Sequence, residues 1–157
     1  MHIFIGADHG GFELKQKIVH WLQQNRYLVE DVEPSAQNPC DYPLIAQKVA
    51  LRVQNNDQHL GILICTSGIG MCIMANKFKN VRAALVHTPE ATQKAREHNH
   101  INILCLAGTL DADTAYLIVQ KCLMATPSME SRHLRRLKQI QDIEDLQKAS
   151  SRHRCKT

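Results

Sequence analysis

A cysteine at the end of an apolar run is the residue of this chain best placed to do chemistry. Cys65 follows the apolar run 60–64 and opens a loop over residues 65–70, with the sequence CTSGIG, that leads into a helical pattern. Helix N-termini carry unpaired N–H groups and partial positive charge, which favour a thiolate and bind anions. The loop therefore offers a general base and a cradle for an oxyanion. The competing interpretation is that Cys65 is only the last buried residue of a core strand.

Other polar groups flank the apolar runs of the chain. Asp8 and His9 directly follow the first run, and His98 and Asn99 stand between a helical pattern and the last run. Ligands of parallel α/β sheets bind beyond the carboxyl ends of the strands. We therefore expect the carboxylate, the imidazoles and the thiol of Cys65 to converge on one edge of a sheet.

Periodicity predicts which elements position these residues. Strands are predicted at 2–7, 27–32, 60–65, 82–86 and 102–107. Helices are predicted at 12–22, 44–53, 68–77, 88–97, 111–124 and 130–147. This alternation indicates right-handed βαβ units and hence a three-layer α/β/α fold with a five-stranded parallel Rossmann-like sheet. We expect a single domain over residues 1–147, followed by a disordered basic tail over residues 148–157.

Composition narrows the class of protein. With 157 residues and 44% apolar content, the chain suits one globular domain. It has no run of about 18 apolar residues, and its start lacks the basic and long apolar parts of a signal peptide. The six cysteines form no CxxC pair, so we interpret them as reduced thiols and not as a disulfide framework or a zinc site. These features predict a cytoplasmic protein that does not span a membrane.

The charge of the chain is unevenly distributed. The net charge is +4, and the positive excess lies wholly from residue 130 onward. Arg132, His133, Arg135, Arg136 and Lys138 form a basic cluster there. Such a cluster suits phosphate on a small molecule or on nucleic acid, or is simply a solvated helix face. Because aromatic residues make up only 4% of the chain, stacking platforms are scarce and we do not expect nucleic-acid binding.

Several common motifs are absent. The chain has no GxxxxGK[ST] loop, and its first strand is followed by GADHGG instead of GxGxxG. A phosphatase-type Cys-x5-Arg motif is excluded because Met71 stands six positions after Cys65. His98 and His100 have no third ligand at a suitable spacing, so we predict no metal ion.

The order of the remaining motifs is far more specific. Along the chain stand GADHGGF-x-LK from residue 6, DYP from 41, C-x-x-GIGM from 65, ANK from 75, VRA from 81 and HN from 98. Over residues 1–146 this order resembles the type B ribose-5-phosphate isomerases, within a wider group that includes isomerases of allose and galactose phosphates. The resemblance implies interconversion of an aldose and a ketose phosphate without a metal or organic cofactor. It also implies a homodimer or tetramer whose active sites cross the subunit boundary, with the C-terminal helix packed on a partner subunit.

The resemblance also assigns roles to individual residues. Cys65 corresponds to the base that moves a proton between C1 and C2, and His98 to the acid that opens the furanose ring. Ser67 stands in the catalytic loop, where the family usually has Thr. The other implied substrate-binding residues are Asp8, His9, Tyr42, Thr66, Gly68, Ile69, Gly70, Asn99, Arg132 and Arg136.

These roles agree with the chemistry of the side chains. The N–H groups of residues 66–70 can hold the enediolate oxyanion as it develops. An imidazole such as that of His98 can donate and accept a proton near neutral pH. His9, Arg132 and Arg136 correspond to phosphate ligands, and the two arginines are spaced to share one helix face.

Two departures from the family pattern bear on the substrate. Thr66 stands where the family usually has Gly, and Thr109 stands where it usually has an Arg that helps hold phosphate. The leading expectation is an isomerase of ribose 5-phosphate and ribulose 5-phosphate, in the pentose phosphate pathway. The alternatives are an isomerase of a six-carbon sugar phosphate, such as allose or galactose 6-phosphate, and a catalytically weakened subunit.

Overall fold

The protein is built around one parallel sheet. The computed structural model describes the backbone of residues 1–34 and 40–154, and the side chains of these ranges as far as residue 147. The strands are β1 (His2–Ala7), β2 (Leu28–Asp31), β3 (His59–Cys65), β4 (Ala83–Leu85) and β5 (Ile103–Ala107). They pair in parallel in the order β2-β1-β3-β5-β4. The predicted five-stranded parallel sheet is confirmed.

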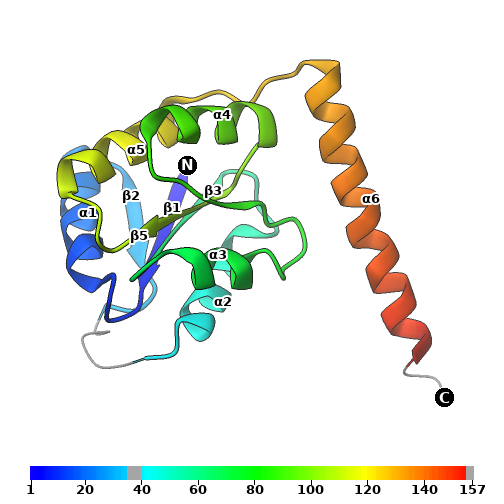
Figure 1. Cartoon of the computed structure of the whole chain (residues 1–157), viewed down its shortest axis with the longest axis horizontal. Coiled ribbons are helices and arrows are strands. Elements are labelled where there is room, and N and C mark those ends of the chain that lie inside the picture. The colour runs from blue at the N-terminus through cyan, green and yellow to red at the C-terminus, as the bar shows by residue number, and fades with distance from the viewer. Residues whose placement is uncertain (35–39, 155–157) are drawn as a thin grey trace.

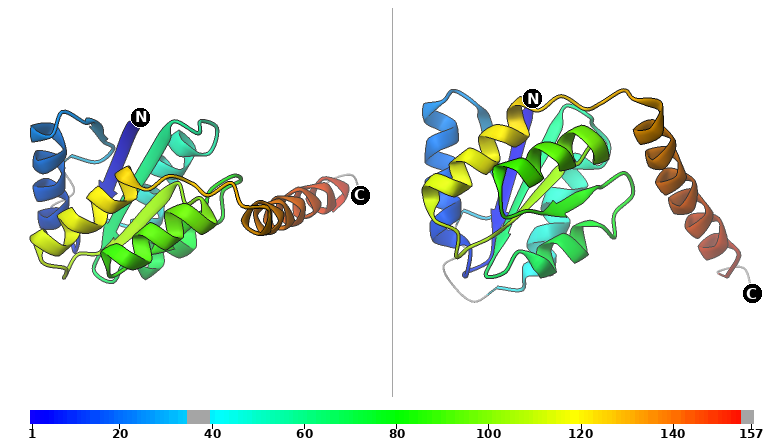
Figure 2. Two further views of the ribbon diagram at one scale, coloured as in Figure 1. Left: turned by 90° about the horizontal axis from the view of Figure 1, so that it is seen from above. Right: turned by 45° about the horizontal axis from the view of Figure 1, so that its top comes forward.

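Helices cover both faces of this sheet and complete the predicted three layers (Figure 1). They are α1 (Phe12–Gln24), α2 (Tyr42–Val53), α3 (Ile69–Ala75), α4 (Pro89–Asn99), α5 (Ala112–Met124) and α6 (Ser131–Arg154). Helices α1, α4 and α5 pack on one face, while α2 and α3 pack on the other (Figure 2). Each face contributes its own apolar cluster, because both faces of β1, β3 and β5 are buried.

Local signals set where several helices begin. Thr88 caps α4 by accepting a hydrogen bond from the N–H of Ala91 at 3.2 Å, and Pro89 occupies the first turn. Asp111 caps α5 in the same way, through the N–H of Thr114 at 2.9 Å. These start signals can be recognised in the sequence because they depend only on residues that are close together in the chain.

A buried ion pair fixes α1 against the strand layer. Lys15 is fully buried, and its Nζ lies 2.9 Å from Oδ2 of Asp31 at the end of β2. The same ammonium donates to the carbonyl oxygen of Glu33 at 2.5 Å. Because a buried ammonium requires both charge compensation and hydrogen bonds, these contacts hold the start of α1 close to the chain that follows β2.

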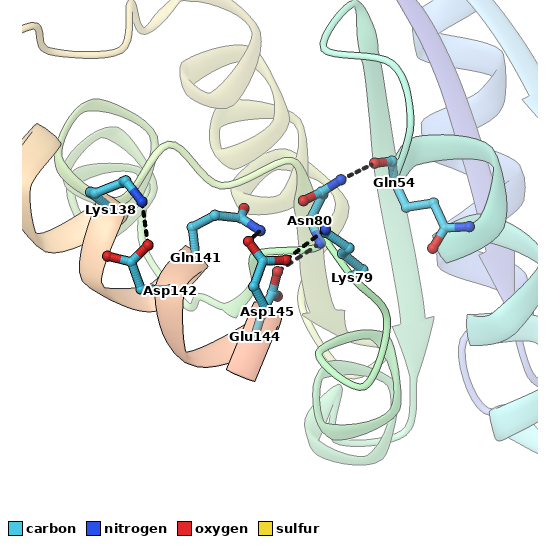
Figure 3. A network of polar contacts seen from close by, with 8 residues as sticks. All are labelled: Gln54, Lys79, Asn80, Lys138, Gln141, Asp142, Glu144 and Asp145. Carbon is cyan, nitrogen blue, oxygen red and sulfur yellow. Dashed lines mark hydrogen bonds and ion pairs between the residues drawn. The ribbon is translucent and has the colours of Figure 1, made fainter. Parts of the chain in front are cut away.

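Helix α6 stands beside the three-layer body and extends away from it (Figures 1 and 2). Its C-terminal half bonds to the loop before β4 (Figure 3). Nζ of Lys79 lies 2.7 Å from Oδ1 of Asp145, and the N–H of Asn80 donates to Oε2 of Glu144 at 3.1 Å. The helix continues to Arg154, into the segment 148–157 for which the sequence predicts a disordered tail, and residues 155–157 lie outside the described residues. None of the described helices is long and apolar enough to cross a membrane.

Candidate active site

Cys65 is the last residue of β3, where the sheet meets the loop that leads into α3. It is buried, with 5% of its surface exposed, and pairs with Ala107 at the end of β5. The N–H of Gly68 donates to its Sγ at 3.1 Å, and the N–H of Gly108 donates to its carbonyl oxygen at 2.7 Å. The sulfur therefore faces a donor that stabilises negative charge, as a general base requires.

The loop after Cys65 depends on a glycine with a left-handed backbone. Gly68 has φ of 75°, and a Cβ at this residue would lie 2.8 Å from the carbonyl oxygen of Leu106. The next residues turn into α3, and Ser67 Oγ accepts a hydrogen bond from the N–H of Ile69 at 3.3 Å. The Gly68 backbone thus aims an N–H at the thiol, which explains why glycine is required there.

We expect the substitution Gly68→Ala to lower the free energy of unfolding by about 1–3 kcal/mol, because the new Cβ meets both an unfavourable φ and a backbone oxygen. Urea unfolding followed by circular dichroism measures the effect. The matched control is Ser67→Ala in the same loop, which removes one exposed hydrogen bond and should cost less than about 1 kcal/mol. A Gly68→Ala protein as stable as the control would contradict the backbone argument.

The loop after β1 packs directly on the Cys65 loop. Asp8 is almost fully buried, and its Oδ1 accepts hydrogen bonds from the N–H groups of Gly10 at 2.9 Å and Gly11 at 3.1 Å. A Cβ on Gly10 would collide with the side chain of Thr66, and one on Gly11 would lie 2.6 Å from the carbonyl oxygen of Ile64. This close approach brings the Asp8 carboxylate and the Thr66 hydroxyl to the same edge of the sheet as Cys65.

Two more of the sequence-predicted residues belong to this edge. Tyr42, the first residue of α2, reaches across to α3: a Cβ on Gly70 would lie 2.6 Å from Cζ of its ring. His9 is exposed and directly follows Asp8. We call the residues Asp8, His9, Tyr42 and 65–70 the thiol half-site. It contains a thiol, a carboxylate, hydroxyls and backbone N–H groups around the carboxyl ends of β1 and β3.

His98 and Asn99 do not join the thiol half-site within one chain. They end α4, which runs back from the carboxyl end of β4, and β5 then begins at Ile103. Cys65 pairs with Ala107, four residues further along β5, or about 13 Å along the strand. The expectation that His98 converges on the edge of Cys65 is therefore wrong for a single chain. In a parallel sheet a loop that leads from a helix into a strand lies at the amino edge, and the sequence interpretation assigned it to the carboxyl edge.

The first turns of α6 lie beside His98. The ring of His133 is stacked on that of His98, with centroids 4.3 Å apart and planes 7° from parallel. Arg132 and Arg136 lie on the same stretch of α6, and Arg132 Nε forms an ion pair with Oε2 of Glu130 at 2.8 Å. We call His98, Asn99, Arg132 and Arg136 the imidazole half-site. The sequence interpretation placed His133 only in a basic cluster and missed its contact with His98.

A cavity of about 430 Å³ lies between α6 and the body, away from Cys65. Its lining is mostly apolar and includes Val81, Ile101, Ile140 and Ile143 together with Asn99. The cavity therefore borders the imidazole half-site and not the thiol. No group of three or more His, Cys, Asp or Glu side chains suited to a metal ion occurs within the described part of the chain.

Three further cysteines, Cys40, Cys72 and Cys105, belong to the same apolar cluster as Cys65, and two of them contact each other. A hydrogen bond with the thiol of Cys105 lowers the pKa of Cys72 to about 7, while the same bond and burial raise the pKa of Cys105. The sequence predicts only that Cys72 and Cys105 are reduced thiols. Because thiol reagents react with thiolates, they are expected to label Cys72 as well, so the role of Cys65 must be tested by substitution.

Comparison with known proteins gives concordant matches. The model of the family described as Ribose/Galactose Isomerase matches residues 3–140. A probable ribose-5-phosphate isomerase B of Mycoplasma genitalium is 38% identical over 141 residues, covering 88% of this chain and 93% of that protein. A D-erythrulose-4-phosphate isomerase of Pectobacterium atrosepticum is 39% identical over 108 residues, covering 68% and 70%.

A solved structure matches the fold equally well. The crystal structure of ribose-5-phosphate isomerase B from Mycoplasma genitalium with bound ribulose-5-phosphate superposes with a TM-score of 0.86 at 37% identity. The match covers 92% of this chain and 96% of that chain. The likeness thus extends over nearly the whole chain.

Proposed function

The chain belongs to the ribose/galactose isomerase family, and on this basis we propose that it interconverts ribose 5-phosphate and ribulose 5-phosphate. The observation that carries the proposal is the environment of Cys65: a buried thiol at a strand end, with a backbone N–H donated to its sulfur. A relative with bound ribulose-5-phosphate shares the fold around it.

The thiol half-site suits an enediolate mechanism. In the open-chain sugar, the Cys65 thiolate removes the C2 proton, and the electrons move onto the carbonyl oxygen at C1. The N–H groups of the loop 66–70 other than those of Gly68 and Ile69, together with the Thr66 hydroxyl, hold the resulting oxyanion. The proton of the C2 hydroxyl passes to the C1 oxygen, the proton held by Cys65 is delivered to C1, and the C2 oxygen becomes the carbonyl. One carbon is reduced as its neighbour is oxidised, so the step balances within the sugar.

We further propose that each active site is shared between two copies of the chain. A five-carbon sugar phosphate is too short to contact the thiol and imidazole half-sites of one chain at once, because they lie at opposite edges of the sheet. Helix α6 contacts the body through a few polar bonds and leaves Ile140, Ile143 and Leu146 exposed, an apolar surface that suits a second copy. A homodimer would bring His98, Asn99 and the two arginines of one copy to the thiol of the other.

Subunit mixing tests this arrangement. A Cys65→Ala chain and a His98→Asn chain, each nearly inactive alone, form mixed dimers with one intact site when co-expressed. We expect about a quarter of wild-type activity, because half of the randomly formed dimers are mixed and each has one working site. Each variant co-produced only with itself is the control. If co-expression restores no activity above these controls, both half-sites act within one chain.

Phosphate binding is expected to rely on fewer cations than in the family pattern. Thr109 follows Gly108, whose N–H bonds the Cys65 carbonyl, so it lies beside the thiol half-site. We expect Thr109→Arg to lower KM for ribose 5-phosphate by up to about tenfold with kcat little changed, since phosphate does not react. Arg136→Ala should raise KM by a similar factor, and Arg135→Ala on the same helix is the control. An unchanged or raised KM in Thr109→Arg would move the phosphate site elsewhere.

A direct assay decides the substrate. Purified protein is supplied separately with ribose 5-phosphate, allose 6-phosphate and erythrulose 4-phosphate, and each ketose or aldose product is quantified. We expect kcat/KM to be highest for ribose 5-phosphate. Preference for the six-carbon sugar would support the alternative assignment, and no turnover of any of them would support a catalytically weakened subunit.

We also propose that the protein works in the cytoplasm. Sugar phosphates are charged and are retained inside the cell, and the described cysteines are free thiols, as is usual in a reducing compartment. Fractionation of the source cells, with activity assayed in each fraction, tests the location.

A further inference from the structure

The contact between α4 and α6 has a specific aromatic geometry. His98 in the last turn of α4 and His133 in the first turn of α6 stack almost parallel, 4.3 Å between ring centroids. His133 has only 5% of its surface exposed, although its neighbours along α6 are exposed. The imidazole of His133 is therefore held under His98 by the junction of two helices.

The Nε2 atom of His133 does not stabilise the fold through a hydrogen bond. Its Nε2 is buried and has no hydrogen-bond partner among the described residues, and the nearest carboxylate oxygen, Oε2 of Glu130, is 4.0 Å away. An unpaired buried polar atom costs stability. An apolar ring would stack on His98 without burying an unpaired polar atom, so packing alone gives no reason for an imidazole at this position.

The charges around His133 keep it neutral. Burial, the facing imidazole of His98, and the guanidinium groups of Arg132 and Arg136 lower the pKa of His133, and only Glu130 opposes them. Two rings this close cannot both be protonated without strong repulsion. His133 therefore presents a neutral ring to His98, the residue that the proposed function uses as an acid.

We propose, on the basis of the proposed function, that His133 is a positioning residue whose neutral ring face fixes the plane of His98 and stabilises its imidazolium for opening the furanose ring. A flat π face attracts a cation stacked on it, and a misplaced acid loses much of its effect. His133 does not touch the sugar in this scheme and acts only through His98.

Two substitutions separate this role from simple packing. His133→Phe keeps a flat neutral face, whereas His133→Leu keeps apolar volume without one. We expect His133→Leu to lower kcat for cyclic ribose 5-phosphate about tenfold with KM little changed, and His133→Phe to retain most of kcat. The substitution Arg135→Ala, on the exposed side of the same turn, is the control for disturbance of α6.

A substrate that needs no ring opening gives a sharper readout. The 4-deoxy analogue of ribose 5-phosphate lacks the hydroxyl that closes the furanose, so it stays open-chain. If His133 acts through ring opening, His133→Leu turns this analogue over at the wild-type rate. Equal losses on the cyclic and open-chain substrates, or equal losses in the Phe and Leu variants, would overturn the proposal.

A measurement on the protein without substrate tests the positioning role of His133 separately from the proposed isomerase function. The imidazole proton resonances of His98 should be shifted upfield by the stacked ring in wild type and in His133→Phe, but not in His133→Leu. A wild-type protein that shows the shift but no isomerase activity would contradict the proposed function and leave the stack intact. A wild-type protein without the shift would contradict the positioning role whatever its activity.

Discussion

Replacing Cys65 with alanine is expected to lower kcat for ribose 5-phosphate at least about 100-fold, because the reaction loses the base that moves the C2 proton. The side chain is small and the N–H of Gly68 that it releases lies in a loop, so the fold should persist. Turnover and circular dichroism are measured on the same preparation. Retention of more than about a tenth of wild-type activity would exclude Cys65 as the base.

Two matched variants sharpen this experiment. Cys65→Ser keeps the size of the side chain but replaces the thiol with a hydroxyl, a far weaker acid, so it should be nearly as inactive as the alanine variant. Cys40→Ala removes a half-buried thiol outside the thiol half-site and should keep full activity. If Cys65→Ser is fully active, the loop and not the sulfur carries the chemistry.

The substitution His98→Asn is expected to lower kcat for cyclic ribose 5-phosphate by about 100-fold, because an amide cannot supply the proton that opens the ring. Turnover of the open-chain 4-deoxy analogue should be largely retained. Comparing forward and reverse rates on the natural sugars would not separate the steps, since one equilibrium links them. The open-chain substrate isolates the C1–C2 proton transfer.

The control for this variant is the same substitution at the neighbouring histidine, His100. His100 is the C-terminal cap of α4 and has φ of 48°, a left-handed backbone that asparagine tolerates well. His100→Asn should therefore keep the helix end and the activity. Failure of the open-chain analogue to rescue His98→Asn, with His100→Asn active, would assign His98 to a step other than ring opening.

Several parts of the site are local properties of the sequence. The strand before Cys65 is recognisable because a strand buried on both faces needs a continuous apolar run. The start of α4 is recognisable because Thr88 and Pro89 act on adjacent backbone groups. The loop 65–70 lies where its neighbours in the chain put it, at the end of β3, so its place in the fold could be predicted.

The position of His98 at the amino edge of the sheet could also be predicted from the sequence, from the path of a helix between two parallel strands. The sequence interpretation did not apply this rule. Strands β4 and β5 are parallel, so α4 must return from the carboxyl edge to the amino edge before β5 begins. A residue at the end of α4 therefore lies away from Cys65 in the same chain. Applying this rule would have divided the site into its two halves from the sequence alone.

By itself, then, the sequence determined the sheet, the helix starts, the thiol at the strand end and the family resemblance. Each of these depends on residues close together in the chain or on the order of motifs. Only the tertiary structure decided that Gly68 points its N–H at the Cys65 sulfur, that Cys72 and Cys105 share a hydrogen bond, and that His133 stacks on His98. The bond to Cys65 depends on the left-handed backbone of Gly68, which the loop adopts where it packs on β5. The other two contacts join residues on different elements, and their geometry depends on how those elements pack, which no local pattern records.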